Sequence, residues 1–372
     1  MTDPIHVVWL VKGLGPGGAE RLLVAAAGTH DRASYDIEVV YLLAWKQHLV
    51  PELEAVGVRC TCLDVRDERD VRWAGRLRSH LRGRPVDIVH SHSPYAAAVG
   101  RLVARSLPRG ERPALVSTEH NPWSTFKAPT RYANAITAPL DDVVLAVSEE
   151  TRESMSRRQR RRAEVLVHGV DVEAIDKLRS QRDRVREELG VGSGTVLIGT
   201  VANYHPKKDW PNLLHAARLL ADRELPVRFC AVGQGPLEAE VLALHRELQL
   251  DGIVTLTGYR PDAVRLMAGC DIFALGSKWE GLPVALMEAS ALGLAVVATR
   301  VGGIPAAFHD GADAVLVPAG SAAALADALE ALVRDERRRH ELGAAARCRA
   351  GDFDVTRAVA RLEQVYRSVT RR

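Results

Sequence analysis

Short apolar runs bounded by turn residues recur along the chain, and amphipathic helical patterns separate them. In the first half these runs are Ile5–Val11, Ile37–Leu43, Val58–Leu63, Val86–His90, Ala114–Thr118, Val143–Val147 and Val165–Val167. In the second half they are Val196–Ala202, Val227–Val232, Ile253–Thr257, Ile272–Leu275, Ala295–Thr299 and Ala314–Val317. Apolar runs that alternate with helices are typical of parallel strands covered on both faces. The pattern therefore predicts an α/β fold with two Rossmann-like, doubly wound parallel sheets.

The length of 372 residues fits two domains of ordinary size. A polar segment, 172–194, ends in a glycine-rich stretch and is expected to be a hinge. We therefore predict domains at 1–175 and 176–351, with a final helix at 352–372 that packs back toward the first domain. Ligands of such sheets bind beyond the carboxyl ends of the strands, so we expect the site in a central cleft that the two domains face.

Charge and cysteine content narrow the class of protein. Lys and Arg number 50 against 47 Asp and Glu, a balance that favours neither a nucleic-acid coat nor an acidic tail. The five cysteines are scattered, which indicates a reducing compartment. The sequence shows neither a secretion signal nor the roughly 18 apolar residues of a membrane span. We expect a cytoplasmic protein that is at most peripheral to the inner face of the membrane.

Two arginine-rich stretches leave an alternative open. One is the run 157–162, and the other consists of Arg76, Arg78, Arg82 and Arg84. In the second stretch Trp73, Leu77 and Leu81 fall on one helical stripe, so the arginines either flank a core face or contact an anionic membrane. Nucleic acid is disfavoured because no aromatic residues interleave the run.

The most informative motif lies between Ser277 and Ser290 and contains two acids, Glu280 and Glu288. If Pro283 lies in the first turn of a helix, Gly281 and Leu282 form its N-terminus, where free amides favour a phosphate or sugar hydroxyls. One ligand could then contact both acids. The alternative is a capping box formed by Ser277 and Glu280. A helix begun at Ser277 would bury Pro283 in its interior at a cost of about 3 kcal/mol, which favours the ligand hypothesis.

Glycines follow the first predicted strand, and Gly13, Gly15 and Gly18 satisfy the dinucleotide pattern. The second strand ends without the acid that would bind an NAD ribose, so an NAD enzyme is disfavoured. A close approach of Gly17 and Gly18 to a ligand explains the glycines better than a tight turn does.

Histidines also follow predicted strands. His120 follows the fifth strand, where an imidazole can bond a sugar hydroxyl, although a lone histidine is more often structural. We expect His90 and His92 to lie on opposite faces, as packing or loop residues rather than a metal pair.

The second domain opens with a strand that leads into Asn203, Lys207 and Lys208 before a helix. A lysine there could neutralise a diphosphate, although a lysine in a loop is usually only solvated. Further along, the backbone and ring of Tyr259, together with Arg260, could hold a nucleotide base.

These residues together resemble the retaining nucleotide-sugar glycosyltransferases of the GT-B fold, specifically family 4 (glycosyl transferases group 1). The resemblance covers nearly the whole chain and implies that Glu280 binds the donor sugar and Glu288 the ribose. It places Gly17 and Gly18 near the donor phosphate and the acceptor, and His120 near the sugar. In this resemblance Asn203 stands where an arginine usually contacts the diphosphate, whereas Lys208 matches. His168, in His-Gly-Val-Asp, replaces an asparagine.

The resemblance implies transfer of a sugar from a UDP-sugar, favoured over a GDP-sugar, to a hydroxyl acceptor, with retention and without a metal or a further cofactor. The implied catalytic residues are His120, Lys208 and Glu280. The implied donor-binding residues are Gly17, Gly18, Asn203, Lys208, Tyr259, Arg260, Gly281, Leu282, Pro283 and Glu288. A nucleotide-sugar epimerase of the same fold and a catalytically weakened binding module remain alternatives, and the acceptor can be a small molecule, a glycan or a lipid-linked molecule.

Overall fold

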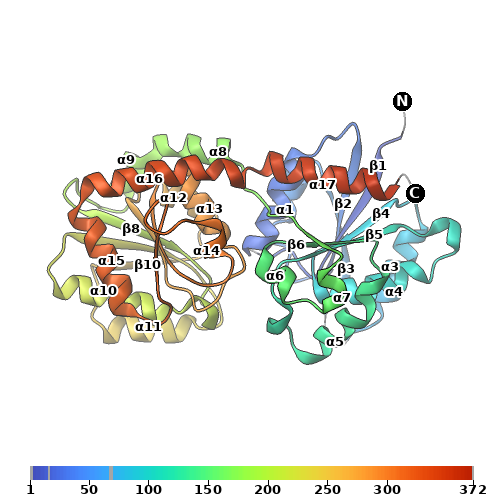
Figure 1. The fold of residues 1–372 in the computed structure, drawn as a ribbon, viewed down its shortest axis with the longest axis horizontal. Coiled ribbons are helices and arrows are strands. Elements are labelled where there is room, and N and C mark those ends of the chain that lie inside the picture. The colour runs from blue at the N-terminus through green and yellow to red at the C-terminus, as the bar shows by residue number, and fades with distance from the viewer. Residues whose placement is uncertain (1–2, 16, 67–69, 371–372) are drawn as a thin grey trace. The chain divides into compact units, whose positions relative to one another are not determined.

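In the computed structural model, which describes residues 3–15, 17–66 and 70–370, the chain forms two compact units. The first unit comprises Met1–Gly169 and Val355–Arg372, and the second comprises Val170–Asp354. Each unit is a parallel sheet covered by helices on both faces (Figure 1). The chain passes between the units after Gly169 and returns at Val355, close to the predicted boundaries at 175 and 351 but not at them.

The sheet of the first unit has seven parallel strands in the order β3-β2-β1-β4-β5-β6-β7. Their bounds are β1 Ile5–Val11, β2 Tyr35–Leu43, β3 Arg59–Val65, β4 Ile88–Ser91, β5 Ala114–Glu119, β6 Val143–Ala146 and β7 Ala163–Val165. The strand order reverses between β1 and β4, which pair directly. Loops that leave the carboxyl ends of strands at such a point diverge and leave room for a ligand.

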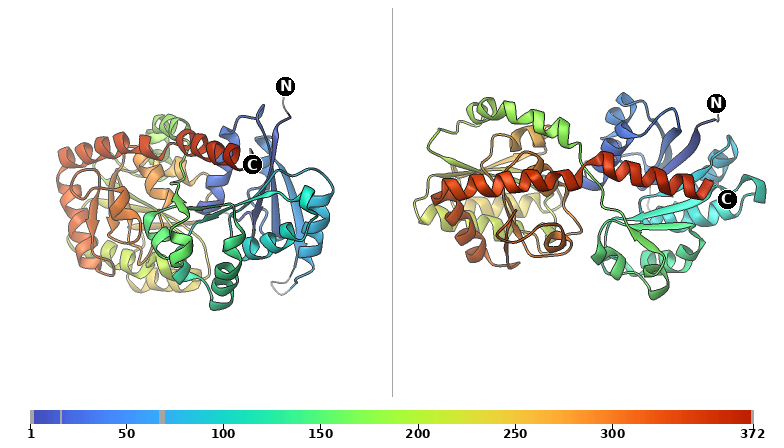
Figure 2. Two further views of the ribbon diagram at one scale, coloured as in Figure 1. Left: turned by 45° about the vertical axis from the view of Figure 1, so that its right-hand side comes forward. Right: turned by 45° about the horizontal axis from the view of Figure 1, so that its top comes forward.

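The helices of the first unit cover its sheet. They are α1 Gly18–Thr29, α2 Val50–Ala55, α3 Trp73–Arg82, α4 Pro94–Arg105, α5 Ala128–Thr137, α6 Glu149–Glu153, α7 Arg157–Arg160 and α17 Val355–Thr370, with short 3-10 turns η1 Arg109–Glu111, η2 Trp123–Thr125 and η3 Ala138–Leu140. The predicted face of α17, made of Val355, Val359, Leu362 and Tyr366, is buried. It belongs to one apolar core with β1 and β2, and α17 lies beside α1 in both further views (Figure 2).

The stripe of α3 is a core face, as one of the two alternatives predicted. Trp73, Leu77 and Leu81 are buried against the other face of the sheet. The arginines of this stretch have partners within the unit: Arg76 contacts Asp70, Arg78 contacts Ser106, Arg82 contacts Glu111 and Arg84 contacts Glu38.

The second unit has six parallel strands in the order β10-β9-β8-β11-β12-β13. Their bounds are β8 Val196–Val201, β9 Val227–Val232, β10 Val254–Gly258, β11 Ile272–Leu275, β12 Ala295–Thr299 and β13 Val315–Val317. The order reverses between β8 and β11, which again pair directly. The predicted pair of doubly wound parallel sheets is confirmed, because every predicted strand overlaps an observed one.

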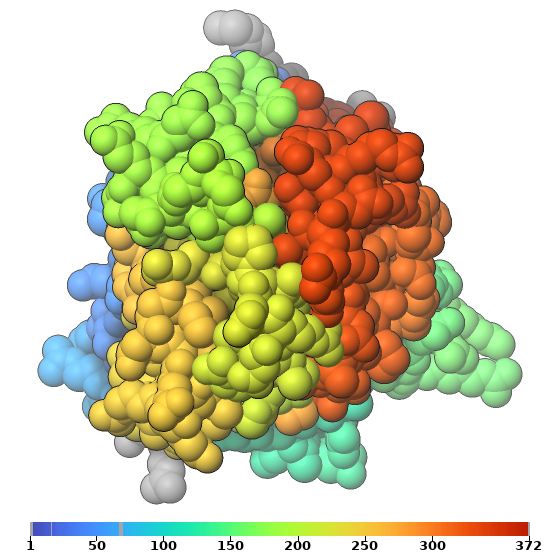
Figure 3. Space-filling model, turned by 90° about the vertical axis from the view of Figure 1, so that its left-hand side faces the viewer, coloured from blue at the N-terminus to red at the C-terminus, as the bar shows by residue number. Residues whose placement is uncertain are grey.

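The helices of the second unit pack on both faces of its sheet. They are α8 Val172–Lys177, α9 Arg182–Glu188, α10 Trp210–Asp222, α11 Glu238–Glu247, α12 Ala263–Met267, α13 Val284–Ala291, α14 Ile304–Ala307, α15 Ala322–Arg334 and α16 Glu336–Ala350, with 3-10 turns η4 Leu178–Gln181, η5 Pro206–Lys208 and η6 Gly351–Phe353. Figure 3 shows the orange-red surface of α15 and α16 beside the yellow surface of α10 and α11, and α10 packs against α15.

The segment 172–194 is anchored to the second unit, so its prediction as a hinge is wrong. Arg182 and Arg186 in its α9 both pair with Asp271, at the start of β11. The same carboxylate accepts a hydrogen bond of 2.7 Å from the backbone of Leu197 in β8. Two charged contacts and a backbone bond on one half-buried acid hold this segment against the sheet.

Two kinds of feature are absent from the described ranges. No helix there is long and apolar enough to cross a membrane. No group of three or more His, Cys, Asp or Glu side chains there is arranged to hold a metal ion.

Candidate functional site

The loops after β8 and β11 meet at the point where the second sheet reverses its strand order, and they bring Lys208 and Glu280 together. The Lys208 ammonium pairs with Oε1 of Glu280. Both side chains are largely buried, with 13% and 4% of their surface exposed. A buried acid without a countercharge is costly, so Lys208 stabilises the ionised carboxylate of Glu280 in this position.

Further contacts hold the loop after β8 against the loop after β11. The backbone N–H of Lys278 donates to the carbonyl of Lys207 at 2.8 Å, and the Lys207 ammonium lies 5.4 Å from the ring centre of Trp279. Lys278 also pairs with Asp209 at 3.0 Å. Asp209 is buried and adopts a left-handed backbone with φ of 46°. Non-glycine residues in that conformation cost free energy and concentrate at functional sites.

Glu280 is not a helix cap. The Ser277 hydroxyl donates to Oε1 of Glu280 at 2.6 Å, side chain to side chain, and Thr299 donates to the Ser277 carbonyl at 2.6 Å. The helix α13 starts only at Val284. The capping-box alternative is therefore wrong, and Ser277 instead orients the carboxylate.

The predicted place of Pro283 needs a correction as well. Pro283 is the N-cap residue, with an extended ψ of 125°, and does not lie in the first helical turn. Gly281 and Leu282 form the turn that precedes it, and the Gly281 carbonyl accepts a bond of 2.7 Å from Gly303. Gly281, Leu282 and Pro283 thus separate Glu280 from Val284, the first residue of α13. Proline fits at this boundary because it lacks the N–H of a helical position.

Glu288 lies in the second turn of α13 and is the one charged residue of a helix whose sequence reads VALMEASA. It is buried, with 9% of its surface exposed. Acids are rarely buried in apolar helices without a specific role. The structure therefore places both acids of the motif in the interior near the carboxyl edge of the sheet.

Three further residues of this unit were predicted to bind the donor: Asn203, Tyr259 and Arg260. The contacts described for them do not involve Lys208 or Glu280. Asn203 is exposed after β8, and its carbonyl accepts from Trp210 at 3.1 Å. Arg260 pairs with Glu188 and Asp262, and Tyr259 beside it is exposed. Burial and then the neighbouring lysines lower the pKa of His205, which opposes a positive charge on its ring.

In the first unit, Gly17 is the N-cap of α1 and Gly18 its first residue. Both glycines follow β1 at the reversal of strand order between β1 and β4. A β-carbon on Gly17 would lie 2.2 Å from the Glu20 carboxylate. The glycine therefore allows an acidic side chain to fold against the helix N-terminus, where negative charge is stabilised.

His120 follows β5, as predicted, and belongs to a row of four stacked or contacting imidazoles: His90, His92, His120 and His168. The rings of His90 and His92 lie 4.0 Å apart. The expectation that these two occupy opposite faces is wrong, because residues two apart in a strand point to the same face. Nδ1 of His92 lies 3.3 Å from Nε2 of His120, and the ring of His168 stacks on His120 at 5.0 Å.

A directed chain of hydrogen bonds supports this row from α17. The Trp9 indole can only donate, and it donates to the Tyr366 hydroxyl at 2.9 Å. The hydrogen of that fully buried hydroxyl needs an acceptor, and Nδ1 of His90 lies 2.6 Å away. His90 must then carry its proton on Nε2 and donate to Thr118 at 2.8 Å. Tyr366 thus sets the tautomer of His90.

The four imidazoles are neutral at pH 7. Burial, followed by the field of His168, lowers the pKa of His120 to about 3. Burial lowers the pKa of His168 to about 4 and the pKa values of His90 and His92 well below the usual 6.5. Among the described atoms, Nε2 of His92 and Nε2 of His168 are buried without a hydrogen-bond partner. A neutral imidazole can offer either a donor or an acceptor to a hydroxyl.

The sequence named His120 but missed its neighbours as a cluster. The spacing of His90 and His92 was the available signal, since a separation of two in a strand predicts one shared face. His168 was noticed only as a replacement in the His-Gly-Val-Asp motif. Tyr366 lies more than 240 residues beyond His120 and was recognised only as part of an apolar face, so its hydroxyl contact could not be anticipated.

The arginine run 157–162 forms α7 and its following turn. Arg157, Arg158, Arg160 and Arg161 are exposed there, and Arg162 donates to the Asp141 carbonyl at 2.7 Å. Contact of these arginines with an anionic membrane stays a prediction.

Two family models match the chain: Glycosyltransferase Family 4 over residues 16–174 and Glycosyl transferases group 1 over residues 181–349. N-acetyl-alpha-D-glucosaminyl L-malate synthase of Bacillus anthracis is 25% identical over 312 residues, 81% of this chain and 80% of that protein. D-inositol 3-phosphate glycosyltransferase of Corynebacterium aurimucosum is 35% identical over 192 residues, 50% of this chain and 46% of that protein. UDP-Gal:alpha-D-GlcNAc-diphosphoundecaprenol alpha-1,3-galactosyltransferase of Escherichia coli is 24% identical over 268 residues, 69% and 68% of the two chains.

Solved structures share the fold along the whole chain. Anabaena Alr3699/HepE in complex with UDP and glucose superposes with a TM-score of 0.85, at 20% identity, over 97% of this chain and 99% of that chain. Sucrose-phosphate synthase of Thermosynechococcus elongatus superposes with a TM-score of 0.80, at 16% identity, over 98% and 99% of the chains. Each half of this chain therefore has counterparts in both the family models and the known folds.

Proposed function

The chain belongs to glycosyltransferase family 4 and has the GT-B fold, and from this premise we propose that it transfers a sugar from a UDP-sugar to an acceptor hydroxyl with retention. The observation that carries the proposal is the buried pair of Lys208 and Glu280, with Glu280 in the loop that leads into α13. This arrangement combines a cation, an oriented acid and a helix N-terminus in one loop pair. A sugar diphosphate needs these groups.

Each group has a role in the proposed reaction. The Lys208 ammonium stabilises the charge that develops on the leaving diphosphate, and the amides at the start of α13 add to it. Glu280, held by the Ser277 hydroxyl, accepts hydrogen bonds from the donor sugar. Glu288 accepts from the ribose. Electrostatic stabilisation by fixed groups of this kind supplies a large share of catalysis in transfer reactions.

The histidine row supports the proposed role of His120 beside the transferred sugar. His120 is held neutral by burial and contacts His92 and His168 on its two sides. A neutral imidazole bonds a sugar hydroxyl without placing a second cation beside the oxocarbenium-like carbon, which would oppose the reaction. Retention would follow from attack on the same face that the diphosphate leaves, as the family resemblance implies.

The choice of UDP over GDP rests on relatives. The Anabaena protein was solved with UDP-glucose, and the name of the Escherichia coli relative specifies a UDP-Gal donor. The relatives' printed acceptors, L-malate, D-inositol 3-phosphate and a diphosphoundecaprenol sugar, all carry anionic groups. We propose that no metal takes part, since Lys208 and α13 provide positive charge for the diphosphate, and that the basic run 157–162 can contact an anionic membrane.

A donor panel tests the proposal. Purified protein is mixed with UDP-glucose, UDP-galactose, UDP-N-acetylglucosamine and GDP-mannose, and nucleoside diphosphate release is followed with and without added acceptors. We expect release with a UDP-sugar, and NMR of the product should show the anomeric configuration of the donor. Folded protein that releases nothing from any donor would sink the proposal, and conversion of the donor sugar without acceptor would identify an epimerase instead.

A further inference from the structure

Two ion pairs cross between the loop after β8 and the loop after β11. Lys208 of the first loop pairs with Glu280 of the second, and Lys278 of the second loop pairs with Asp209 of the first at 3.0 Å. Each loop thus contributes one lysine and one acid to the two pairs, and both loops belong to the second unit. The proposed transfer gives a role to Lys208 and Glu280 alone, so the pair of Asp209 and Lys278 needs an explanation of its own.

Asp209 is the residue at which the chain turns from η5 directly into α10. It is at once the C-cap of η5 and the N-cap of α10, and its backbone is left-handed, with φ of 46° and ψ of 53°. Its carbonyl accepts a bond of 3.0 Å from the N–H of Asn212 in α10. Glycine adopts this conformation without steric cost, whereas aspartate adopts it at a cost in free energy. The backbone alone favours a glycine at this position, so the acid points to a role of the side chain.

The Asp209 carboxylate does not cap the helix that it precedes. An aspartate at an N-cap usually accepts a hydrogen bond from an amide of the first helical turn. Within the described residues, the Asp209 side chain makes no such bond to α10. The side chain is 5% exposed and pairs with Lys278, which is 61% exposed. Asp209 therefore forgoes both a relaxed backbone and a helix cap while its charge is paired with the loop after β11.

We infer that Asp209 is a positioning residue, which holds Lys208 at the donor site through its own pair with Lys278. This inference rests on the proposed function, because it assigns the Lys208 ammonium to the donor diphosphate. A bound diphosphate competes with Glu280 for that ammonium and weakens one of the two ionic links between the loops. The link between Asp209 and Lys278 then keeps Lys208 in place, and a fixed cation stabilises the leaving group better than one that must reorganise.

Calorimetry with UDP tests the role of Asp209 and needs no acceptor. Asp209→Asn keeps the size of the side chain and leaves no buried charge uncompensated. We expect it to weaken UDP binding about tenfold, with a melting temperature within about 4 °C of the wild type. Coulomb attraction alone predicts the opposite change, because removal of a negative charge beside the site should tighten the binding of an anion. UDP affinity that is unchanged or higher in Asp209→Asn overturns the inference.

A second variant serves if Asp209→Asn does not fold. Asp209→Gly suits the left-handed backbone better than aspartate does. It should lose as much UDP affinity as Asp209→Asn, because it also lacks the carboxylate. Asp209→Gly that folds and binds UDP as tightly as the wild type overturns the inference as well.

Variants of Lys278 show whether the pair acts as a unit. Lys278→Arg should retain the UDP affinity of the wild type, since the charge that pairs with Asp209 is preserved. The double variant Asp209→Asn, Lys278→Met should bind UDP no more weakly than Asp209→Asn alone, because the link is already broken. A further loss in the double variant would mean that Lys278 contacts the diphosphate itself, which contradicts the inference.

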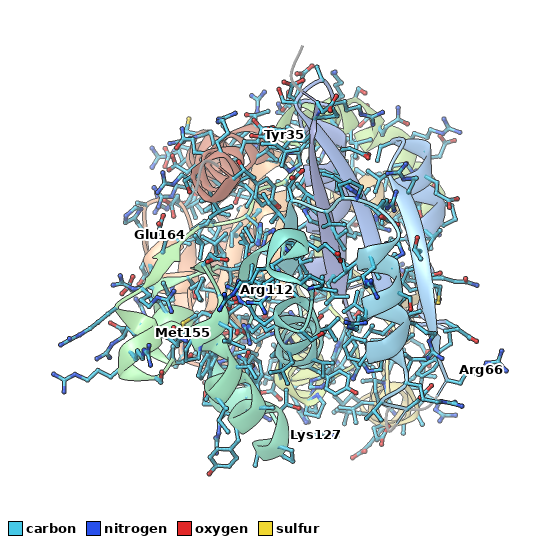
Figure 4. All side chains as sticks on the ribbon, turned by 90° about the vertical axis from the view of Figure 1, so that its right-hand side faces the viewer. Tyr35, Arg66, Arg112, Lys127, Met155 and Glu164 are labelled. Carbon is cyan, nitrogen blue, oxygen red and sulfur yellow. The ribbon has the colours of Figure 1, made fainter. Side chains whose placement is uncertain are left out.

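Asp64 provides the matched control. It is another aspartate with a left-handed backbone, with φ of 47°, and it pairs with Arg66 at 3.2 Å. This pair is exposed on the first unit, where Figure 4 shows the labelled Arg66 pointing outward. Lys177 is an exposed lysine of the second unit, in α8, and pairs with Glu173. Asp64→Asn and Lys177→Ala should both bind UDP as the wild type does, and losses equal to that of Asp209→Asn would contradict a specific role of Asp209.

The outcomes separate this inference from the proposed function. A wild type that binds neither UDP nor any nucleotide sugar rejects the transferase and the inference with it. A wild type that binds UDP, together with Asp209→Asn and Asp209→Gly variants that bind it equally well, leaves the transferase standing and rejects the role of Asp209 alone.

Discussion

The Tyr366 hydroxyl in α17 lies 2.6 Å from Nδ1 of His90, near the end of β4, although the two residues are 276 positions apart. Trp9 in β1 donates to the same hydroxyl, so the Tyr366 hydroxyl connects β1 to the histidine row through two consecutive hydrogen bonds. The last helix of the chain thereby determines on which nitrogen His90 carries its proton. Removal of that one oxygen leaves both a buried donor and a buried acceptor without their partner.

Tyr366→Phe should therefore lower the free energy of unfolding by about 1–3 kcal/mol, because the indole N–H and the imidazole lose a shared partner. Chemical denaturation of the intact chain measures it. Tyr132→Phe is the control, since the Tyr132 side chain is exposed on α5, and its change should stay within about 0.5 kcal/mol. A Tyr366→Phe variant as stable as the wild type would refute the assigned direction of these bonds.

Acid should destabilise the protein through the histidine row. His120 and His168 have folded-state pKa values of about 3 and about 4, whereas an unfolded histidine has about 6.5. A lowered pKa means that the unfolded chain binds protons first, so stability is complete above pH 6.5 and is lost as pH falls from there toward 4. The melting temperature should fall over this window.

Glu119 changes the stability with pH in the opposite direction, because burial raises the pKa of its carboxyl to about 7. The stability that the protonated Glu119 contributes is lost as pH rises from about 4.5 to 7. This loss partly offsets the stability that the neutral histidines gain over the same range. His168→Asn separates the two effects by removing one buried imidazole and the field it exerts on His120. The variant should lose less melting temperature between pH 7 and 5 than the wild type. His340→Asn, at an exposed histidine of α16, should leave the profile unchanged, and identical profiles for all three proteins would contradict the account.

A buried ionic network joins α4 to the start of β6, and breaking it should be costly. Arg101, which is 2% exposed, donates to Asp141 at 2.8 Å and to Asn134 at 2.6 Å. Arg101→Ala should lower the free energy of unfolding by about 3–5 kcal/mol, because the Asp141 carboxylate stays buried without its countercharge. Denaturant titration measures the loss.

The controls for this network are an exposed pair and a double variant. Arg152→Ala removes the partner of Glu149 at the surface and should change little, since exposed pairs contribute weakly. Arg101→Met combined with Asp141→Asn should recover part of the loss because it leaves no uncompensated charge. If Arg101→Ala and Arg152→Ala cost the same, the network does not stabilise the fold as described.

Asn203 offers a test of gained function that rests on the proposed donor. Asn203 is exposed after β8, so an arginine fits there without burying its charge. Asn203→Arg should tighten UDP binding about tenfold by adding a charge-assisted hydrogen bond to the diphosphate. Asn203→Gln keeps a polar side chain without the charge and should bind as the wild type does. Calorimetry with UDP distinguishes them, and no gain in Asn203→Arg would place the diphosphate elsewhere.

The fold could be predicted because the information is local. The run Ala295–Thr299 is buried on both faces and Val227–Val232 is buried except at Arg228, and the observed strands have the same bounds. The helix start at α13 was misplaced by only a turn, because Pro283 is compatible with both the first helical turn and the position before it. Sequence patterns indicate which segments form strands and helices, but they do not determine the residue at which a helix begins or ends.

The site was predictable only where one segment carries the chemistry. Lys208 and His120 could be proposed as site residues because each follows a strand, and Glu280 because it precedes Gly281 and Pro283 at a predicted helix start; these roles stay predictions. Their partners could not be predicted. The sequence suggested only one role for Ser277, the disfavoured capping box, whereas its hydroxyl donates to Glu280. Tyr366 and His168 reach the histidine row through tertiary packing alone.

The most direct test of the central claim is a calorimetric titration of UDP and a UDP-sugar into the wild type and the double variant Lys208→Met, Glu280→Gln. The double variant removes both charges of the buried pair together, so no charge is left uncompensated and the fold should persist. We predict that the wild type binds and that the double variant loses at least about a hundredfold in affinity for the UDP-sugar, while Lys177→Ala binds as the wild type does. A double variant that melts like the wild type and binds the UDP-sugar with the same affinity would contradict the claim that Lys208 and Glu280 form the donor site.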